Sequence, residues 1–310
     1  MRRIHPYRLV LTAGVAIAAF GGCGPAVLSV SDAIVSPGEP VRLTAFVYRD
    51  TIRGVGQDIE GVQVRFNVDG RPAGSARTDD DGWASVQWAL PVGGASRFEA
   101  TATVDDRTIQ AGGAIYTWDK DRIMLAVDVD GTLAETDYED LILDRRDIES
   151  QPLPHAQQTL EKLSADFQVL YLTARPQYYI EKTRRWLRDC GFPNRPVFTA
   201  PRLRDTIRHA RFKRRMLATL RRDWPNLLIG IGNKAADAQA YGASGMLSLI
   251  VRRVPDKDFG PHAIVLADWS AVSRFFDANA GALRDPDELT RAIRGKTMLL
   301  RPVVAWQEED

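Results

Sequence analysis

Two aspartates stand two positions apart in the stretch LAVDVDGTLAETDY, residues 125–138. The stretch begins as an apolar strand, and Asp128 and Asp130 follow where that strand is predicted to end. Because residues i and i+2 of an extended chain point to the same side, the two carboxylates are placed to act together. Such a pair can attack an electrophile, exchange a proton or hold a cation that prefers oxygen ligands.

Two simpler interpretations of this stretch are a tight turn and a calcium-binding loop. A turn accounts for Asp130 and Gly131 but leaves Asp128, at the end of an apolar strand, without a reason to be there. An EF-hand loop needs an oxygen ligand at its fifth position and glycine at its sixth, where this chain has Thr132 and Leu133. A catalytic or metal-binding role is therefore the better interpretation.

The elements around the two aspartates follow an alternating pattern. From Trp118 onward, short apolar runs alternate with amphipathic segments of helical length, which predicts a doubly wound α/β domain with a parallel sheet over residues 118–280. Ligands of such sheets bind at the carboxyl ends of the strands, so Asp128 and Asp130 belong to the active edge. The expected strands lie within 123–131, 167–175, 196–201, 226–233 and 246–253, and the expected helices within 154–166, 177–191, 204–223 and 234–245.

Residues 23–117 carry a different pattern, in which apolar and polar residues alternate along four runs between turn residues. This alternation predicts strands with one buried face, and together they predict an all-β sandwich. The order of SPGEPVRLTAFV, GVQVRFNVDGRPAG, ARTDDDGWASVQW and RFEATATVD resembles bacterial immunoglobulin-like domains of the invasin type, which implies a spacer or an adhesive unit. The residues expected to face the core are Val41, Leu43, Ala45, Val47, Val62, Val64, Phe66, Val68, Ala84, Val86, Trp88, Leu90, Phe98, Ala100, Ala102 and Val104.

A second acidic cluster lies in the TDDDG segment of the β-rich region. Asp79, Asp80 and Asp81 offer oxygen ligands for calcium, but Asp-Gly is also a common sequence in a tight turn between strands. The turn is the preferred interpretation because it needs no further ligands.

The first 22 residues have the layout of a signal peptide. MRRIHPYR is basic, LVLTAGVAIAAF is apolar, and small residues precede Cys23. The apolar run is shorter than the ~20 residues that span a bilayer. This order resembles a bacterial lipoprotein signal, although Phe20 replaces the usual leucine, and it implies that Cys23 is lipidated and anchors the protein in the cell envelope. Plain secretion or an inner-membrane anchor explains the basic and apolar parts but not the cysteine.

Four segments of the α/β region resemble the ordered motifs of the haloacid dehalogenase superfamily of phosphotransferases. They are DVDGT (128–132), YLTAR (171–175), Lys213 in RFKRRML, and GIGNKAADAQAY (230–241). YLTARPQYY and GNKAADAQAYGASG are similar to lipin-type phosphatidate phosphatases, over roughly residues 120–255. Most of the superfamily carries an acidic residue where this chain has Asn233, and the GNxxxD form points to the lipin branch. Some lipin-like domains lack the catalytic aspartates and sense lipids, whereas this chain keeps both.

The resemblance implies a magnesium-dependent phosphatase. Asp128 would form an aspartyl-phosphate, and Asp130 would protonate the leaving alkoxide and then deprotonate the attacking water. It further implies catalytic roles for Thr173 and Lys213, substrate binding by Thr132 and Arg175, and Mg²⁺ held by Asp128, Asp130 through its backbone carbonyl, Asp237 and Asn233. Taken alone, Lys213 fits a solvated helix face and Arg175 an exposed helix start.

Composition and charge bear on the substrate. The chain has 310 residues, is 45% hydrophobic and carries a net charge of +1, which excludes a fibrous or largely disordered protein. Residues 184–222 contain thirteen Lys or Arg and two acidic residues, a balance that would attract an anionic membrane or a nucleic-acid end. Nucleic acid is not favoured, because the segment shows no interleaved aromatic pattern typical of single-strand binding. A solvated helical face explains the same charges equally well. About 40 residues separate the first and second motifs, too few for a large lid.

Phosphatidate or a related lipid phosphate is the expected substrate. The alternatives are a periplasmic phosphomonoesterase of small soluble phosphates and a lipid-binding or adhesive surface protein without activity. Residues 281–310 are interpreted as a C-terminal tail with a short helix in DELTRAIRG and an apolar end, MLLRPVVAW.

Overall fold

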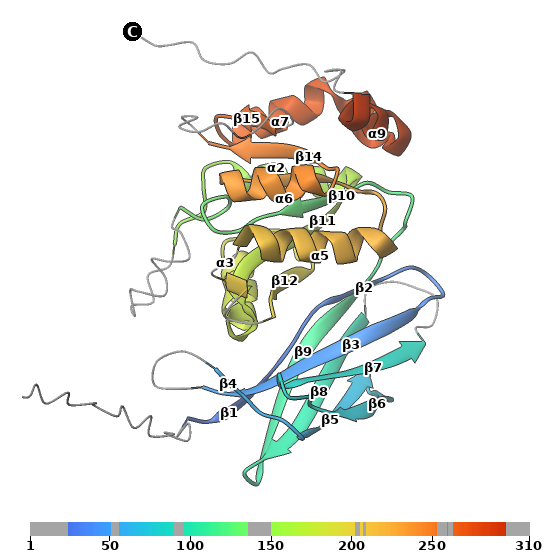
Figure 1. Ribbon diagram of the computed structural model, residues 1–310, viewed down its shortest axis with the longest axis vertical. Helices are drawn as coiled ribbons and strands as arrows, with labels where there is room; N and C mark the ends of the chain where they lie inside the picture. Colours follow the sequence, from blue (N-terminus) through green and yellow to red (C-terminus); the bar gives the residue numbers. More distant parts are fainter. Residues whose placement is uncertain are drawn as a thin grey trace, which may run out of the picture.

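The computed structural model describes residues 24–50, 56–89, 96–135, 150–201, 205–206, 209–252, 259 and 263–295. These residues form a β-sandwich followed by an α/β domain (Figure 1). The predicted signal segment, the lipidation site Cys23 and the apolar end of the predicted tail lie outside the described residues. Within the described part, none of the helices has the length and apolar character needed to span a bilayer.

Two sheets build the sandwich. One contains β1 (Ala26–Val30), β3 (Pro40–Arg49), β4 (Gln57–Asp58) and β7 (Trp83–Ala89), in which β3 pairs with each of the others. The other has the order β2-β9-β8-β5-β6, with β2 (Ala33–Val35), β5 (Gln63–Val68), β6 (Arg71–Arg77), β8 (Ser96–Val104) and β9 (Arg107–Thr117). The all-β sandwich expected from the alternation is confirmed.

The alternating residues face each other between the two sheets. Val41, Leu43, Ala45 and Val47 of β3 are all buried, and they meet the apolar faces of β5 and β8 in one core. The acidic cluster is the turn that its sequence indicates. The Asp79 carboxylate accepts the backbone N–H groups of Asp81 and Trp83 at 3.1 and 2.8 Å, and Gly82 adopts the left-handed φ of +76° that glycine favours.

The second domain is built on a parallel sheet of order β12-β11-β10-β13-β14-β15. Its strands are β10 (Met124–Val127), β11 (Gln168–Pro176), β12 (Val197–Ala200), β13 (Leu227–Gly232), β14 (Leu247–Val251) and β15 (Ala263–Leu266). The chain leaves β10 in one direction towards β12 and returns to the other side of β10 with β13. The carboxyl ends of β10 and β13 therefore flank the switch point at which such sheets bind ligands.

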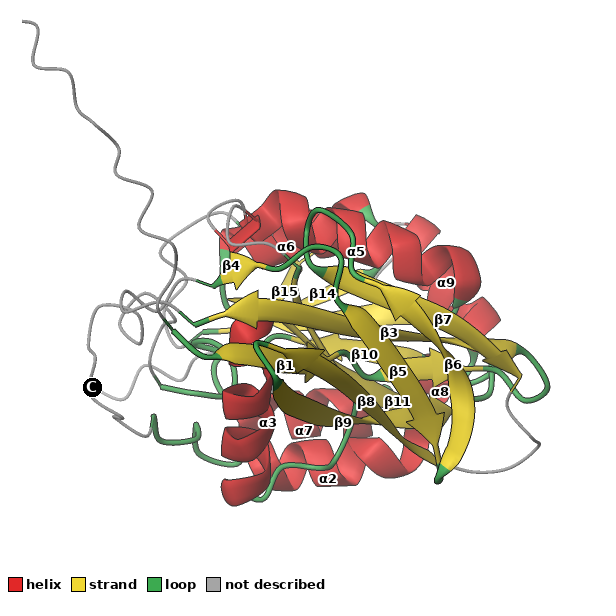
Figure 2. Ribbon diagram, turned by 90° about the horizontal axis from the view of Figure 1, so that it is seen from below, coloured by secondary structure: helices red, strands yellow, loops and turns green. Residues whose placement is uncertain are grey.

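Helices cover both faces of this sheet (Figure 2). On one face lie α2 (Ala156–Asp166), the 3₁₀ helix η1 (Gln177–Tyr179) leading into α3 (Ile180–Asp189), and α7 (Trp269–Ala278). On the other lie α5 (His209–Asp223) and α6 (Ala235–Ala243). In α2, for example, Ala156, Leu160 and Leu163 recur at helical spacing and are buried against the sheet. The doubly wound architecture is confirmed.

The predicted boundary at residue 280 needs a correction. Residues 280–295 form α8 (Ala280–Arg284) and α9 (Pro286–Gly295), the second of which matches the helix expected in the tail. Leu283 and Leu289 are fully buried in the core shared by β10, β11 and α7. Because both leucines pack in the core of the α/β domain, residues 281–295 of the predicted tail belong to that domain.

Candidate active site

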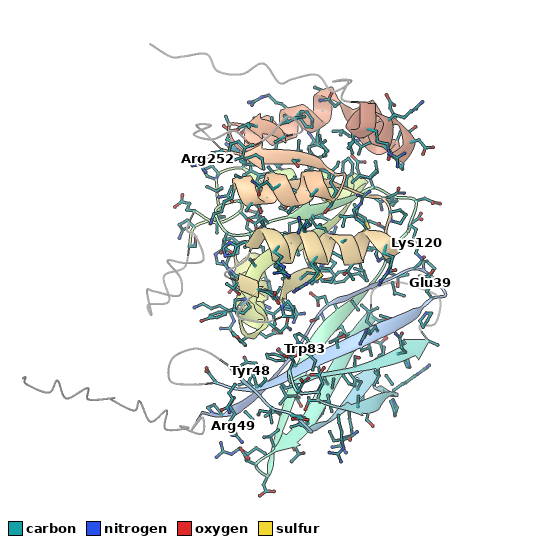
Figure 3. The ribbon with its side chains drawn as sticks, viewed as in Figure 1. Glu39, Tyr48, Arg49, Trp83, Lys120 and Arg252 are labelled. Atoms are coloured by element: carbon teal, nitrogen blue, oxygen red, sulfur yellow. The ribbon has the colours of Figure 1, made fainter. Side chains whose placement is uncertain are left out.

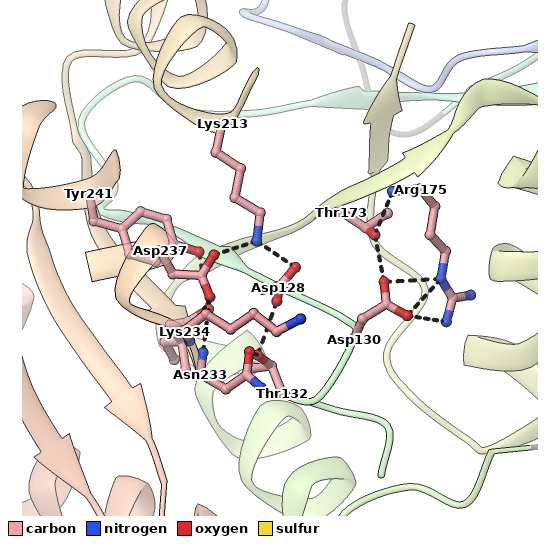
Figure 4. Close-up of polar contacts among 11 residues, drawn as sticks. Asp128, Asp130, Thr132, Thr173, Arg175, Lys213, Asn233, Lys234, Asp237 and Tyr241 are labelled. Atoms are coloured by element: carbon pink, nitrogen blue, oxygen red, sulfur yellow. Dashed lines mark hydrogen bonds and ion pairs between the residues drawn. The ribbon is translucent and has the colours of Figure 1, made fainter. Parts of the chain in front are cut away.

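Asp128, Lys213 and Asp237 converge at the carboxyl edge of the sheet (Figure 4). Asp128 follows β10, Lys213 comes from α5 and Asp237 from the first turn of α6. The Lys213 ammonium lies 2.6 Å from a carboxylate oxygen of Asp128 and 2.6 Å from one of Asp237. The three residues are 4% exposed or less, so their charges interact in a largely dehydrated environment. The solvated-face interpretation of Lys213 is therefore wrong.

The loop after β13 completes this cluster. The Thr132 hydroxyl lies 3.2 Å from the Asp128 carboxylate and 3.3 Å from the Asn233 side-chain oxygen. Asp237 accepts the backbone N–H groups of Asn233 and Lys234 at 3.1 and 3.0 Å, which caps α6. A side chain at Gly232 would place its Cβ 2.6 Å from the Cβ of Asp237, so glycine is needed for the loop to close this tightly.

Asp130 belongs to a separate network. Its carboxylate accepts hydrogen bonds from Arg175 Nη2 at 2.7 Å, from Arg175 Nε at 3.0 Å and from the Thr173 hydroxyl at 3.0 Å. Arg175 Nη1 also donates to the Thr183 hydroxyl of α3 at 3.1 Å. Asp130 and Arg175 are 7% and 5% exposed, so this ion pair is buried. The exposed-arginine interpretation of Arg175 is wrong.

Thr173 belongs to the same network as Asp130. It lies within β11, which continues to Pro176, and η1 begins at Gln177. Its hydroxyl donates to Asp130 and accepts the backbone N–H of Arg175 at 3.1 Å. In this arrangement Thr173 and Arg175 both hold the Asp130 carboxylate.

The two networks share one pocket. Asp128, Asp130, Lys213 and Asp237 line it together with Ala174, His209, Lys234 and Ala236. Its volume is about 20 Å³, room for roughly one water. His209 and Lys234 were not among the site residues predicted from the sequence. Lys234 follows Asn233 directly in the fourth motif, and Figure 4 shows its side chain extending towards Asp128 and Asp130.

Two carboxylates, Asp128 and Asp237, share the ammonium of Lys213 at the centre of the site. Burial raises the pKa of Asp128 to about 7, and the charges of Asp237 and Asp130 act in the same direction, against Lys213. Burial alone would lower the pKa of Lys213, but Asp128 and Asp237 outweigh it and raise that pKa. Lys213 therefore stays charged, and Asp128 keeps its proton to near neutral pH unless a further cation binds beside it.

This shift predicts how the stability of the metal-free protein depends on pH. The folded protein retains the Asp128 proton up to about pH 7, whereas the unfolded chain loses it near 3.8. The resulting stabilisation is present below about pH 4 and is lost as the pH rises through about 7. In EDTA, the free energy of unfolding of the wild type minus that of Asp128→Asn is expected to fall by a few kcal/mol between pH 4 and 8. Parallel pH profiles of the two proteins would refute this assignment.

The donor set fits magnesium. Asp128, Asp237 and Asn233 supply only oxygen ligands, and Lys213 already places one positive charge between the two carboxylates. In the described part of the chain, no three His, Cys, Asp or Glu side chains are arranged around one point as a complete metal cage. Magnesium does not require such a cage, since proteins commonly hold it through one or two carboxylates with water and substrate phosphate.

Comparison with known families agrees with this geometry. Residues 125–249 match the family model of the PITM 1-3 LNS2 domain. The match covers both networks, and it supports a lipin-type, phosphatase-like hydrolase for this part of the chain. No curated protein matches the chain.

Several solved structures resemble about 30% of the chain. The CARDB domain of a Pyrococcus furiosus protein is 12% identical, with 30% of this chain and 88% of that chain covered and a TM-score of 0.23. The D00-D0 domain of intimin is 24% identical, with 30% and 48% covered and a TM-score of 0.23. The M1 domain from titin is 11% identical, with 30% and 95% covered and a TM-score of 0.23.

Proposed function

We propose that the protein is a magnesium-dependent phosphatase that hydrolyses a phosphomonoester through an aspartyl-phosphate on Asp128. The observation that carries the proposal is the placement of Asp128 at the sheet's switch point, in contact with Lys213 and in one pocket with Asp130 and Asp237. The LNS2 match over residues 125–249 supports the same reaction class.

The first half of the reaction transfers the phosphoryl group to the enzyme. A carboxylate oxygen of Asp128 attacks phosphorus while the bond to the substrate oxygen breaks. The leaving alkoxide takes a proton from Asp130, whose side chain Arg175 and Thr173 hold in place. Lys213 offsets negative charge on the transferring group because its ammonium already lies against the nucleophile.

The second half releases phosphate. Asp130, now without its proton, accepts one from a water molecule, and the resulting hydroxide attacks the phosphorus of the aspartyl-phosphate. The bond between phosphorus and the Asp128 oxygen then breaks, which restores the carboxylate and the proton on Asp130. A bound Mg²⁺ would add Lewis-acid stabilisation of the phosphoryl oxygens, and Asp128, Asp237 and Asn233 with the backbone carbonyl of Asp130 would hold it.

A lipid phosphate at a membrane surface is the proposed substrate. Arg211 and Arg214 lie exposed on α5, the helix that carries Lys213. Basic side chains beside the site attract an anionic bilayer and its phosphorylated lipids. Lipidation at Cys23 would hold the protein in the cell envelope beside such a substrate.

The decisive assay uses protein from residue 24 onward with Mg²⁺. Phosphate release is measured from phosphatidate in mixed micelles and from a soluble aryl phosphate, with Asp128→Asn beside the wild type. Release from phosphatidate that disappears in the variant would support the lipid phosphatase. Release only from the soluble ester would support a phosphomonoesterase of small phosphates, and vesicle binding without turnover would support a lipid-binding protein.

Removal of magnesium is expected to stop the reaction. EDTA should abolish phosphate release and added Mg²⁺ should restore it, because the ion would offset the repulsion between the phosphoryl oxygens and the Asp128 and Asp237 carboxylates. Asp237→Asn should need at least about 10-fold more Mg²⁺ for half-maximal rate, a loss in the range seen for disturbed metal sites. An unchanged magnesium requirement in this variant would remove Asp237 from the proposed ligands.

A further inference from the structure

The sequence resemblance implies that the β-sandwich is a spacer or an adhesive domain. In the structure, the sandwich contacts the segment that follows Arg175 in the chain. Gln177 begins η1 two residues after Arg175, is 1% exposed, and bridges the two domains. Its side-chain nitrogen donates to the Ser29 hydroxyl of β1 at 3.4 Å, and its oxygen accepts from Thr199 of β12 at 2.5 Å. Ser29 is 2% exposed, so this contact lies inside the interface.

Asp32, in the loop between β1 and β2, contacts two elements of the α/β domain. Its buried carboxylate lies 2.8 Å from Arg184 of α3 and accepts the backbone N–H of Val197 at 3.0 Å. The same carboxylate accepts Ala114 N–H within the sandwich at 3.1 Å. One side chain thereby ties a β-sandwich strand to α3 and to the edge strand β12. A buried carboxylate that loses such partners is destabilising, so the two domains are held in one arrangement.

Aromatic packing reinforces the contact at η1. The Tyr178 ring lies 5.4 Å from Tyr48 and 6.1 Å from Phe46, both on β3, measured between ring centroids. A Cβ at Gly56 would lie 2.8 Å from the Tyr178 ring, so this glycine leaves the space in which the ring sits. Ring pairs at these separations add stabilisation beyond the area that they bury.

These interdomain contacts lie next in the chain to Thr183, whose hydroxyl accepts a hydrogen bond from Arg175. The Thr183 hydroxyl accepts from Arg175 Nη1 at 3.1 Å and donates to the Tyr179 carbonyl at 2.9 Å. Tyr178, which precedes Tyr179, packs against the sandwich, and Arg184, which follows Thr183, pairs with Asp32 of the sandwich. The sandwich therefore contacts the chain on both sides of the Thr183–Tyr179 hydrogen bond. From there Arg175 reaches the Asp130 carboxylate at 2.7 Å.

We infer that the β-sandwich is a positioning element of the active site, which sets the Asp130 carboxylate through Gln177, Arg184 and the Thr183–Arg175 link. Asp32 is its principal positioning residue. The inference rests on the proposed function for its catalytic consequence, because Asp130 is the proposed proton donor. Misplacement of such a donor by about 1 Å costs up to about 100-fold in rate, so a remote contact can control the reaction.

The test compares Asp32→Asn with Glu39→Gln in the protein from residue 24 onward. Glu39 pairs with Lys120 at 2.5 Å across the same two domains, but the pair is about half exposed and lies at the other end of the interface (Figure 3). Glu39→Gln therefore removes a charged contact between the two domains that does not involve η1 or α3, and serves as the control. Ser29→Ala serves as a second, milder variant if Asp32→Asn does not fold.

Leaving-group dependence separates positioning from a general loss of stability. An alkyl phosphate such as glycerol phosphate needs its leaving oxygen protonated, whereas p-nitrophenolate leaves without a proton. Asp32→Asn is expected to lower kcat on the alkyl phosphate by about 10-fold or more, with KM nearly unchanged, and on p-nitrophenyl phosphate by less than about 3-fold. Glu39→Gln is expected to match the wild type on both substrates.

Hydrogen exchange supplies a readout that needs no activity. Amides of residues 173–183 are expected to exchange at least about 10-fold faster in Asp32→Asn than in the wild type or Glu39→Gln, because their interdomain contacts are loosened. Unchanged exchange in this segment, or equal rate losses on both substrates, would overturn the inference. A wild type that releases no phosphate would refute the proposed function instead, and the exchange result would still decide whether the sandwich holds this segment.

Discussion

Asp128→Asn is expected to lower phosphate release by at least about 1,000-fold on any substrate that the wild type hydrolyses, because the variant has no nucleophile. Asparagine has nearly the shape of aspartate and removes one of the three carboxylates that crowd the pocket. The fold should therefore survive, and urea denaturation should give a free energy of unfolding no lower than that of the wild type near pH 8.

A covalent intermediate gives this prediction a second measurement. Denaturing the wild type during turnover should trap phosphate on a peptide that contains Asp128, and the variant should trap none. Asp130→Asn is the matched control, since it removes the neighbouring carboxylate of the same motif but leaves the nucleophile. It should slow the alkyl ester more than the aryl ester and still form the adduct with the aryl ester. Undiminished release by Asp128→Asn would exclude the proposed intermediate.

The strands that position the site were predictable because a parallel sheet buries both faces. β10 to β14 are short, mainly apolar and mostly buried runs. The residues that follow β10 and β13 fall at the active edge because that edge is set by the order of the strands. β15 was missed because its four residues, Ala263–Leu266, are mostly half-buried at the sheet edge and too few to show a period. β9 was missed although Ile109, Ala111 and Ile115 contact the core of the sandwich, because Gly112 and Gly113 interrupt the alternation and glycine is uncommon in strands.

The sequence indicated which residues belong to the site better than it indicated which of them pair with one another. Lys213 shares α5 with five arginines, and the sequence alone does not tell which of these basic side chains turns inward. The same holds for Arg175, whose pairing with Asp130 joins residues 45 positions apart. The interdomain role of Asp32 has no local signal at all, because the carboxylate finds Arg184 and Val197 only after the two domains have packed together.

Replacement of Lys213 by methionine is expected to have the largest effect on stability. Methionine fills a similar volume but leaves the buried Asp128 and Asp237 carboxylates without the ammonium that they share. Breaking a buried ion pair by removing one partner typically costs about 3–5 kcal/mol, because the remaining charge stays uncompensated. Urea denaturation in EDTA at pH 8 measures this loss, and phosphate release should fall with it because the charge that offsets the phosphoryl group is gone.

Lys162→Met is the matched control for this change. Lys162 also pairs with a carboxylate at 2.6 Å, that of Asp277, but both side chains are at least 50% exposed. An exposed pair is worth about 0–1 kcal/mol, so the control should be nearly neutral. Acid should distinguish the two variants further. Protonation of Asp128, whose pKa burial raises to about 7, removes part of the uncompensated charge, so the stability loss of Lys213→Met should shrink as the pH falls towards 4. The stability loss of the control should not change with pH. Equal losses in both variants, or a Lys213→Met deficit independent of pH, would mean that Lys213 is not the counter-charge of the two carboxylates.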